Sequence, residues 1–104
     1  MTKGIPRKYA LTSVGPGWSR LINNLYDAKP KDVMVTQVKE KYGTLRFYVA
    51  SAPEWYFDLI DCYEDMSGRI CETCGAPGRT REYNGWLFTS CSECNDKMTM
   101  AKNG

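Results

Sequence analysis

Cys71-Glu-Thr-Cys74 and Cys91-Ser-Glu-Cys94 are the two segments that decide how the C-terminal part of the chain folds. Sixteen residues separate the two Cys-x-x-Cys pairs. Each pair can place two thiolates on one side of a tight turn, and two such turns form the tetrahedral four-sulfur cage typical of structural zinc. The sequence therefore predicts a structural Zn²⁺ site with Cys71, Cys74, Cys91 and Cys94 as ligands. Four cysteines leave no open position for a catalytic role of the metal.

A β-hairpin is predicted between the two cysteine pairs. Residues 79–83 and 86–90 flank Asn84-Gly85, the dipeptide that most strongly favours a two-residue hairpin turn, because both turn residues must tolerate positive φ. A knuckle, a hairpin and a second knuckle make a zinc ribbon. A last short helix is expected at 95–102, with Met98 or Met100 packing back on the lobe.

Two amphipathic helices are predicted upstream of the ribbon. The first spans residues 17–28 and ends before Pro30; the second begins at Pro53 and ends near Gly68. Their apolar stripes follow helical spacing and consist of Trp18, Leu21, Ile22, Leu25 and Tyr26, and of Tyr56, Leu59, Ile60, Tyr63 and Met66. Cys62, the fifth cysteine, is expected to be a small core residue of the second helix.

A second hairpin is predicted between these helices, with strands at 32–40 and 44–50 and a three-residue loop at 41–43. This loop length places Val33, Val35 and Gln37 on one face with Leu45, Phe47 and Val49. The opposite face then carries Met34, Thr36, Val38, Glu40, Arg46 and Tyr48. A change of one residue in the loop would alter these partners.

Composition limits the class of protein. The 104 residues include 42% hydrophobic and 25% charged residues, which is ordinary for a folded domain, and no apolar run is long enough to span a membrane. The N-terminal residues lack the apolar core of a signal peptide, and paired cysteines in a reducing compartment favour metal over disulfides, so a cytoplasmic protein is expected. The formal net charge of +2 falls near zero once four thiolates bind Zn²⁺.

These elements give an α+β fold, in which a small antiparallel sheet packs with two helices and precedes a C-terminal zinc ribbon. The expected organisation is a basic N-terminal tail at 1–14, held near Tyr9 and Leu11, an α+β core at 15–69, and a four-cysteine zinc-ribbon lobe with a short helix at 70–104.

The chain contains no histidine, which removes Ser-His and Cys-His catalysis and the ordinary histidine base. Polar and aromatic residues around the first hairpin instead offer a recognition surface for a partner. The candidates for partner binding are Lys39, Glu40, Lys41, Tyr42, Arg46 and Tyr48, with Trp86 on the ribbon as a secondary one. The alternative for this stretch is a solvated face with a Glu40–Arg46 cross-strand pair.

Two other functions stay open at this point. Arg79, Arg81 and Tyr83 on the ribbon, with Trp86, could bind single-stranded nucleic acid by stacking and phosphate contacts. Alternatively, Tyr83 and Trp86 simply pack over the zinc lobe. Asp58, Asp61 and Asp65 share one side of the second helix and could hold Mg²⁺ for an enzyme, although a solvated acidic face is the simpler interpretation.

Residues 17–94 resemble a group of uncharacterised small bacterial and phage proteins. The resemblance rests on Gly17-Trp18, on the run from Gln37 to Tyr48 (QVKEKYGTLRFY), on the segment 70–78 with its CETCGAPG sequence, and on Gly85-Trp86. Members of this group often have histidine as the last ligand, where this chain has Cys94. The resemblance implies a polar signature centred on Lys39, Glu40, Lys41, Gly43 and Arg46, and it supplies no activity or substrate.

The sequence therefore favours a non-enzymatic, zinc-stabilised binding protein, a protein-binding adaptor or inhibitor. The phage association suggests a host protein, including a defence factor, as its partner. The alternative functions are a nucleic-acid-binding zinc ribbon and, less favoured, a Mg-dependent enzyme.

Overall fold

The computed structural model describes the backbone of residues 4–103 and the side chains of residues 4–97. In chain order the elements are α1 (Arg7–Thr12), the 3-10 helix η1 (Pro16–Trp18), α2 (Ser19–Ala28), β1 (Val35–Lys41), β2 (Thr44–Val49), α3 (Glu54–Ser67), β3 (Arg79–Tyr83), β4 (Trp86–Ser90) and α4 (Ser92–Asn103). The strands form two antiparallel hairpins, β1–β2 and β3–β4. The predicted α+β class is confirmed.

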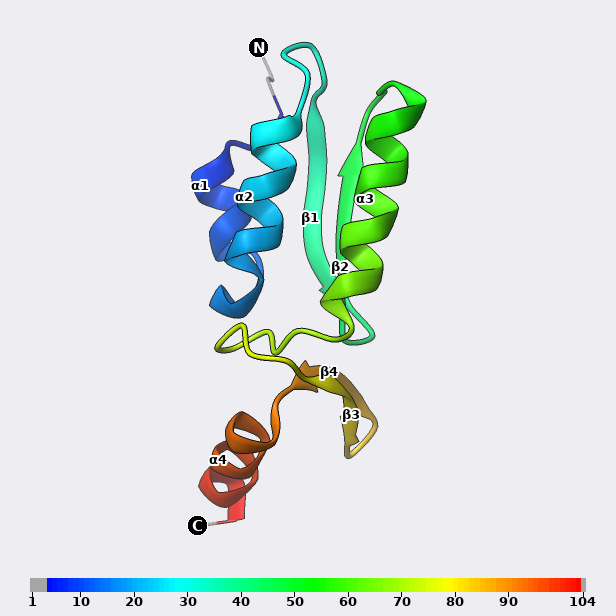
Figure 1. Cartoon of the computed structure of the whole chain (residues 1–104). Helices are drawn as coiled ribbons and strands as arrows, with labels where there is room; N and C mark the ends of the chain where they lie inside the picture. Colours follow the sequence, from blue (N-terminus) through cyan, green and yellow to red (C-terminus); the bar gives the residue numbers. More distant parts are fainter. Residues whose placement is uncertain (1–3, 104) are drawn as a thin grey trace.

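Figure 1 shows two parts stacked along the long axis of the molecule, which measures 48 × 26 × 22 Å. The first part contains α1, α2, the β1–β2 hairpin and α3, and the second contains the β3–β4 hairpin and α4. A loop after α3 leads from one part to the other, close to the tip of the β1–β2 hairpin. Within the described residues, no helix combines the length and the apolar character needed to cross a membrane.

The core lies between α2, α3 and one face of the β1–β2 hairpin, and large aromatic side chains dominate it. Trp18 and Tyr56 are fully buried. The Trp18 indole donates a hydrogen bond to the Ile70 carbonyl at 2.9 Å, and the Tyr56 hydroxyl donates to the Leu25 carbonyl at 2.7 Å. Each ring thus buries a large apolar surface while its polar atom keeps a partner. The apolar stripes predicted for the two helices supply half of the buried core residues, and the β1–β2 hairpin supplies most of the others.

The register of the β1–β2 hairpin differs from the predicted one. The turn contains two residues, Tyr42 and Gly43, both with positive φ, and the pairing shifts between Val35 and Gln37. Because of this irregularity, Val38 faces the core opposite Phe47, whereas Gln37 is exposed opposite Tyr48. The predicted grouping of Gln37 with Val35 and Phe47, with Val38 on the opposite face, was therefore wrong.

Both edges of the hairpin are covered by other parts of the chain. At the β2 edge, the Leu45 amide donates to the Ser67 hydroxyl and the Phe47 amide donates to the Glu64 carboxylate, each at 2.8 Å. At the β1 edge, the Ile5 amide donates to the Val35 carbonyl at 2.8 Å. A two-stranded sheet would otherwise present unpaired backbone groups, and α3 and the N-terminal segment satisfy them.

Two further expectations for the first part are corrected. The segment expected to be a basic tail contains α1, in which Ala10 is buried and Leu11 packs on the core, while Tyr9 remains exposed. Cys62 is exposed rather than buried, because the buried side of α3 is formed by Tyr56, Ile60 and Ser67 and the helical period turns Cys62 away from it.

The ribbon hairpin forms with the predicted strand bounds, and Asn84 and Gly85 both have positive φ, as its turn type requires. The last helix is longer than predicted and begins at Ser92, inside the second cysteine pair. The expected packing of Met98 or Met100 concerns side chains that lie outside the described residues.

Two contacts dock the ribbon onto the first part. The Gly17 amide donates to the Glu72 carbonyl at 2.7 Å. A Cβ atom at Gly17 would lie 1.9 Å from the Cys71 carbonyl oxygen, so this position before α2 has no room for a side chain. At the other contact, Thr89 donates its hydroxyl to the Gly43 carbonyl. The first cysteine pair and the first hairpin tip are thereby fixed relative to each other.

Candidate metal centre

The four cysteines of the two pairs converge at the end of the ribbon. Their sulfur atoms all lie within 4.8 Å of one another, and the Cys74 and Cys91 sulfurs are 3.7 Å apart. Zn–S bonds of about 2.3 Å in a tetrahedron separate the sulfurs by about 3.8 Å, so the spacing fits a four-thiolate site. Among the described residues, these four form the only group of three or more potential cysteine, histidine or carboxylate ligands that could hold a metal ion.

The first pair sits on a tight knuckle. The Cys71 amide donates to the Ala76 carbonyl at 2.7 Å, and the Gly75 amide donates back to the Cys71 carbonyl at 2.9 Å. Gly75 has a φ of +85°, which a residue with a side chain rarely adopts. This turn brings the sulfurs of Cys71 and Cys74 to the same side, which explains why glycine follows the second cysteine.

The second pair uses the start of α4. Cys91 precedes the helix and Cys94 lies in its first turn, where the Cys94 amide donates to the Cys91 sulfur at 3.4 Å. Free amides and the helix dipole favour negative charge at this position. The helix therefore supports the ionised form of the second pair as well as its geometry.

The protonation of the cluster shows why a cation fits it. Burial raises the pKa of the Cys71 thiol, but amide donors from Cys74, Cys91 and Thr73 outweigh that effect and lower it to about 6. Hydrogen bonds to the neighbouring Cys91 and Cys74 sulfurs raise the pKa of Cys94 to about 12. Four thiolates crowded together repel one another, and a bound divalent cation removes this cost, so metal binding releases protons from the cluster.

The candidate partner-binding residues fall into two adjoining regions. A groove of about 430 Å³ lies between the tips of the two hairpins. Its walls are formed by Glu40, Lys41, Tyr42, Glu82, Gly85, Trp86 and Leu87. The structure thus brings Trp86 of the ribbon beside three candidates from the first hairpin. Sequence reasoning missed Glu82 and Leu87, since the strand pattern of the ribbon does not reveal which hairpin it will face.

The remaining candidates lie on the outer face of the β1–β2 hairpin. Lys39 stands directly opposite Arg46, and its ammonium lies 6.0 Å from the centre of the Tyr48 ring. Glu40 lies opposite Leu45 and accepts a hydrogen bond from the Gly43 amide at 2.7 Å, so the proposed Glu40–Arg46 cross-strand pair is wrong. Two cations opposed across a ladder destabilise a sheet, and Glu40 is turned away from them.

One of the residues considered for nucleic-acid binding, Arg81, already makes hydrogen bonds within the ribbon. Arg81 is half-buried, and its guanidinium donates to the Ser90 carbonyl at 3.1 Å and to the Ser92 hydroxyl at 3.4 Å. Arg79 is exposed and Tyr83 is half-buried. The Arg81 contacts tie β3 to the second cysteine pair, which is a structural role.

The acidic residues of α3 do not converge on a cation. Asp58 and Asp61 are exposed, and Asp65 pairs with Arg69 at 2.6 Å on the surface. Within the described residues, no group of carboxylates has the spacing of metal ligands. The structure does not support the magnesium site considered from the sequence.

Comparison with known proteins adds no family to these observations. No protein-family model, no curated protein and no solved structure matches the chain.

Proposed function

We propose that this chain is a non-enzymatic, zinc-stabilised binding protein that takes a protein partner in the groove between its two hairpin tips. The groove has an aromatic side chain on each hairpin, Tyr42 and Trp86, and each is 66% exposed. Large aromatic side chains at a concave site are the residue types that dominate binding energy at protein interfaces. The pair of exposed aromatics across this groove is the observation that carries the proposal.

The backbone of Tyr42 supports a binding role. Its φ is +56°, in the left-handed region, where residues other than glycine, asparagine and aspartate are uncommon. A tyrosine at this turn position stabilises the fold less than asparagine would, and its ring points to solvent rather than into the core. Strain of this kind is tolerated where the side chain serves a function.

The charges around the groove favour a protein over a nucleic acid. Lys41 lines the groove, and Lys39 and Arg46 on the adjoining outer face extend its cationic side. Glu40 and Glu82 also line it, and carboxylates repel a phosphate backbone. We infer a partner segment that inserts an apolar or aromatic residue between Tyr42 and Trp86 and presents carboxylates to the lysine side. A bacterial host protein, including a defence factor, is the source we propose for it.

Zinc is the metal we propose for the centre. A closed, tetrahedral, all-thiolate site takes zinc or iron, and the chain offers no open coordination position for chemistry at the ion. Bound metal would hold the two knuckles together, and zinc binding is worth on the order of 10–16 kcal/mol in isolated zinc-finger peptides. Elemental analysis of the purified protein should find one zinc per chain, and iron in its place would refute the identity of the metal.

The test of the function is affinity capture from bacterial lysate with and without nuclease, compared between the wild-type chain and a Tyr42→Asn/Trp86→Ser variant. A stoichiometric protein that survives nuclease and is lost with the variant supports the proposal. Tyr9→Ala removes an exposed aromatic from α1 that does not line the groove, and this variant should capture the partner normally.

Salt dependence separates the two classes of partner. Phosphate contacts make affinity fall steeply as salt rises, whereas a groove centred on apolar side chains is less sensitive. Recovery that disappears with nuclease, together with a steep salt dependence, would refute the protein-binding proposal in favour of nucleic acid. A companion variant with alanine at Lys39, Lys41 and Arg46 should lose the partner while keeping its zinc.

A further inference from the structure

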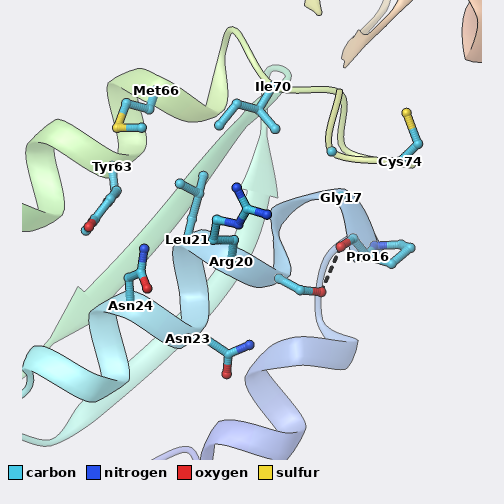
Figure 2. Close-up of a pocket in the computed structure, with 12 residues that line it drawn as sticks. Pro16, Gly17, Arg20, Leu21, Asn23, Asn24, Tyr63, Met66, Ile70 and Cys74 are labelled. Atoms are coloured by element: carbon cyan, nitrogen blue, oxygen red, sulfur yellow. Dashed lines mark hydrogen bonds between the residues drawn. The ribbon is translucent and has the colours of Figure 1, made fainter. Parts of the chain in front are cut away.

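A second hollow lies on another side of the molecule, where α2, α3 and the first cysteine knuckle meet. It has a volume of about 580 Å³, within the range of small-molecule sites. In Figure 2, Arg20, Leu21 and Asn24 come from α2, Tyr63 and Met66 come from α3, and Ile70 closes it from the segment that follows. None of its lining residues belongs to the groove between the hairpin tips.

The polar groups of this hollow suit an anion. Arg20 supplies a guanidinium and Asn24, one turn further along α2, an amide, and both residues are exposed. The hydroxyl of Tyr63, which also lines the hollow, is directed away from Arg20 (Figure 2). Figure 2 shows the Arg20 side chain rising from α2 toward the segment that carries Ile70. Among the twelve lining residues, Arg20 is the only cation, and none has a carboxylate that could pair with it. A single guanidinium beside neutral hydrogen-bonding groups matches a carboxylate ligand with one negative charge.

The remaining wall is apolar. Leu21, Met66 and Ile70 line the hollow, and Met66 is 40% exposed although it belongs to the apolar stripe of α3. Methionine adapts its shape to irregular partners, which suits a ligand-facing wall. A ligand that fits both parts has a carboxylate at one end and an apolar body at the other.

The first knuckle forms one wall of the hollow. Cys74 and Gly75 belong to the lining, and Figure 2 shows the Cys74 sulfur directed away from the other labelled side chains. That sulfur lies in the four-cysteine cluster, so a metal bound there would fix the position of this wall. A ligand that contacts the ordered knuckle must bind the metal-loaded protein more tightly, and by linkage it must also strengthen metal retention.

We propose that this hollow is a binding site for a small monocarboxylate with an apolar body, and that its occupancy is coupled to the metal centre. The coupling rests on the proposed zinc centre, whereas the site itself is independent of the hairpin groove. Arg20 binds the carboxylate with Asn24 beside it on α2, and Leu21, Met66, Ile70 and the ring of Tyr63 line the part that receives the apolar body.

The test uses 3-phenylpropionate as the probe, with 3-phenylpropanamide as its uncharged counterpart and propionate as the acid without a ring. Amide resonances of the metal-loaded protein are followed by NMR during each titration. We expect 3-phenylpropionate to shift resonances of residues 16–24 and 63–75 and to bind about tenfold more tightly than either control compound, since a charge-assisted hydrogen bond and a buried ring are each worth at least that factor.

Variants make the assignment specific. Arg20→Gln should weaken 3-phenylpropionate about tenfold and leave the amide compound unaffected. Arg69→Gln removes an exposed arginine that pairs with Asp65 outside the hollow, and it should bind as the wild type does. Equal binding of the acid and the amide, equal binding of propionate, or unchanged binding by Arg20→Gln would each overturn the proposal.

Metal retention provides the readout for coupling. At a concentration that just saturates the wild type, 3-phenylpropionate should slow the transfer of zinc to a chromogenic chelator, and the same concentration should have a smaller effect in Arg20→Gln. The metal content of each sample is measured before the titration, so a protein without zinc refutes the metal assignment separately from the carboxylate site. Unchanged transfer in a zinc-loaded wild type would refute the coupling.

Discussion

The Thr89 hydroxyl donates a hydrogen bond to the Gly43 carbonyl and thereby joins the ribbon to the tip of the first hairpin. Thr89 is fully buried, and its hydroxyl also lies 3.0 Å from the hydroxyl of Thr80. Gly43 has a φ of +83° and lies against Thr80 and Phe88, so a side chain at this position would crowd both residues. This contact therefore fixes the ribbon against the hairpin tip that forms one wall of the groove.

Replacement of Thr89 with valine keeps the side-chain shape and removes the hydroxyl. The Gly43 carbonyl then loses its buried donor, and we expect the free energy of unfolding to fall by about 1–3 kcal/mol in denaturant titrations. Thr80→Val is the matched control, because it removes the exposed partner and leaves the bond to Gly43 in place, so its effect should be smaller. Equal losses for the two variants would show that the Thr89–Gly43 contact does not support the interface.

Loss of one metal ligand should unfold the ribbon. Cys74→Ser removes one thiolate from the four-sulfur cluster, and a serine hydroxyl is a poor replacement for it. We expect this variant to lose its zinc by elemental analysis and to lose the chemical-shift dispersion of residues 70–94. Cys62→Ser is the matched control, since Cys62 is exposed on α3 and should keep both the metal and the stability of the wild type.

Local sequence patterns predicted the elements of this fold well, because they reflect interactions within each element. Asn84-Gly85 predicted the ribbon turn, and the helical spacing from Trp18 to Leu25 predicted the buried side of α2. The register of β1 was not predictable in this way. The irregularity after Val35 and the two-residue turn at Tyr42 depend on how the strand meets the rest of the core.

The metal centre was predictable for a related reason: its ligands recur as two short motifs with fixed internal spacing. The groove was not, since it forms where two hairpins distant in sequence meet. Tyr42 and Trp86 could each be singled out as aromatic residues near turns, but their placement in one groove depends on long-range contacts such as the one from Thr89 to Gly43. No periodic pattern in the sequence specifies a contact between residues so far apart along the chain.

Replacement of Tyr42 with asparagine should separate stability from binding. Asparagine tolerates the left-handed conformation of this position, so we expect the variant to be up to about 1 kcal/mol more stable than the wild type in denaturant titrations, less whatever the contact with Lys41 contributes. Affinity for the captured partner should fall at least tenfold, because one wall of the groove loses its ring. A variant that is more stable and still binds fully would remove Tyr42 from the site.

A side chain at Gly17 should displace the first knuckle. The Cβ atom of alanine would meet the carbonyl oxygen of Cys71, which is rigid backbone rather than a mobile side chain. We expect Gly17→Ala to lower the melting temperature and to accelerate zinc transfer to a chelator, since the knuckle must move. Gly85→Ala serves as a contrast: a Cβ there meets no atom within 4 Å, so only its left-handed φ is disturbed and zinc transfer should be unchanged.

Glu64 should make stability depend on pH in a direction opposite to that of an ordinary surface carboxylate. Burial raises the pKa of Glu64 more than the Phe47 amide and Arg46 lower it, so the native state binds this proton more tightly than the unfolded state does. Its contribution to stability is full below the ordinary glutamate pKa of about 4.3 and is lost as the pH rises through the higher native value.

Glu64→Gln isolates this effect, because the amide oxygen can still accept from the Phe47 amide while no charge has to be buried. The stability of the variant relative to the wild type should therefore rise as the pH increases from about 4 toward neutrality, measured by urea titration at several pH values. The cysteines titrate alike in both proteins, so their contribution cancels in the difference. Asp58→Asn removes an exposed charge from the same helix and serves as the control for the change in net charge. A flat difference for Glu64→Gln would mean that the native state ionises this carboxylate without penalty and that its bond to the β2 edge outweighs its burial.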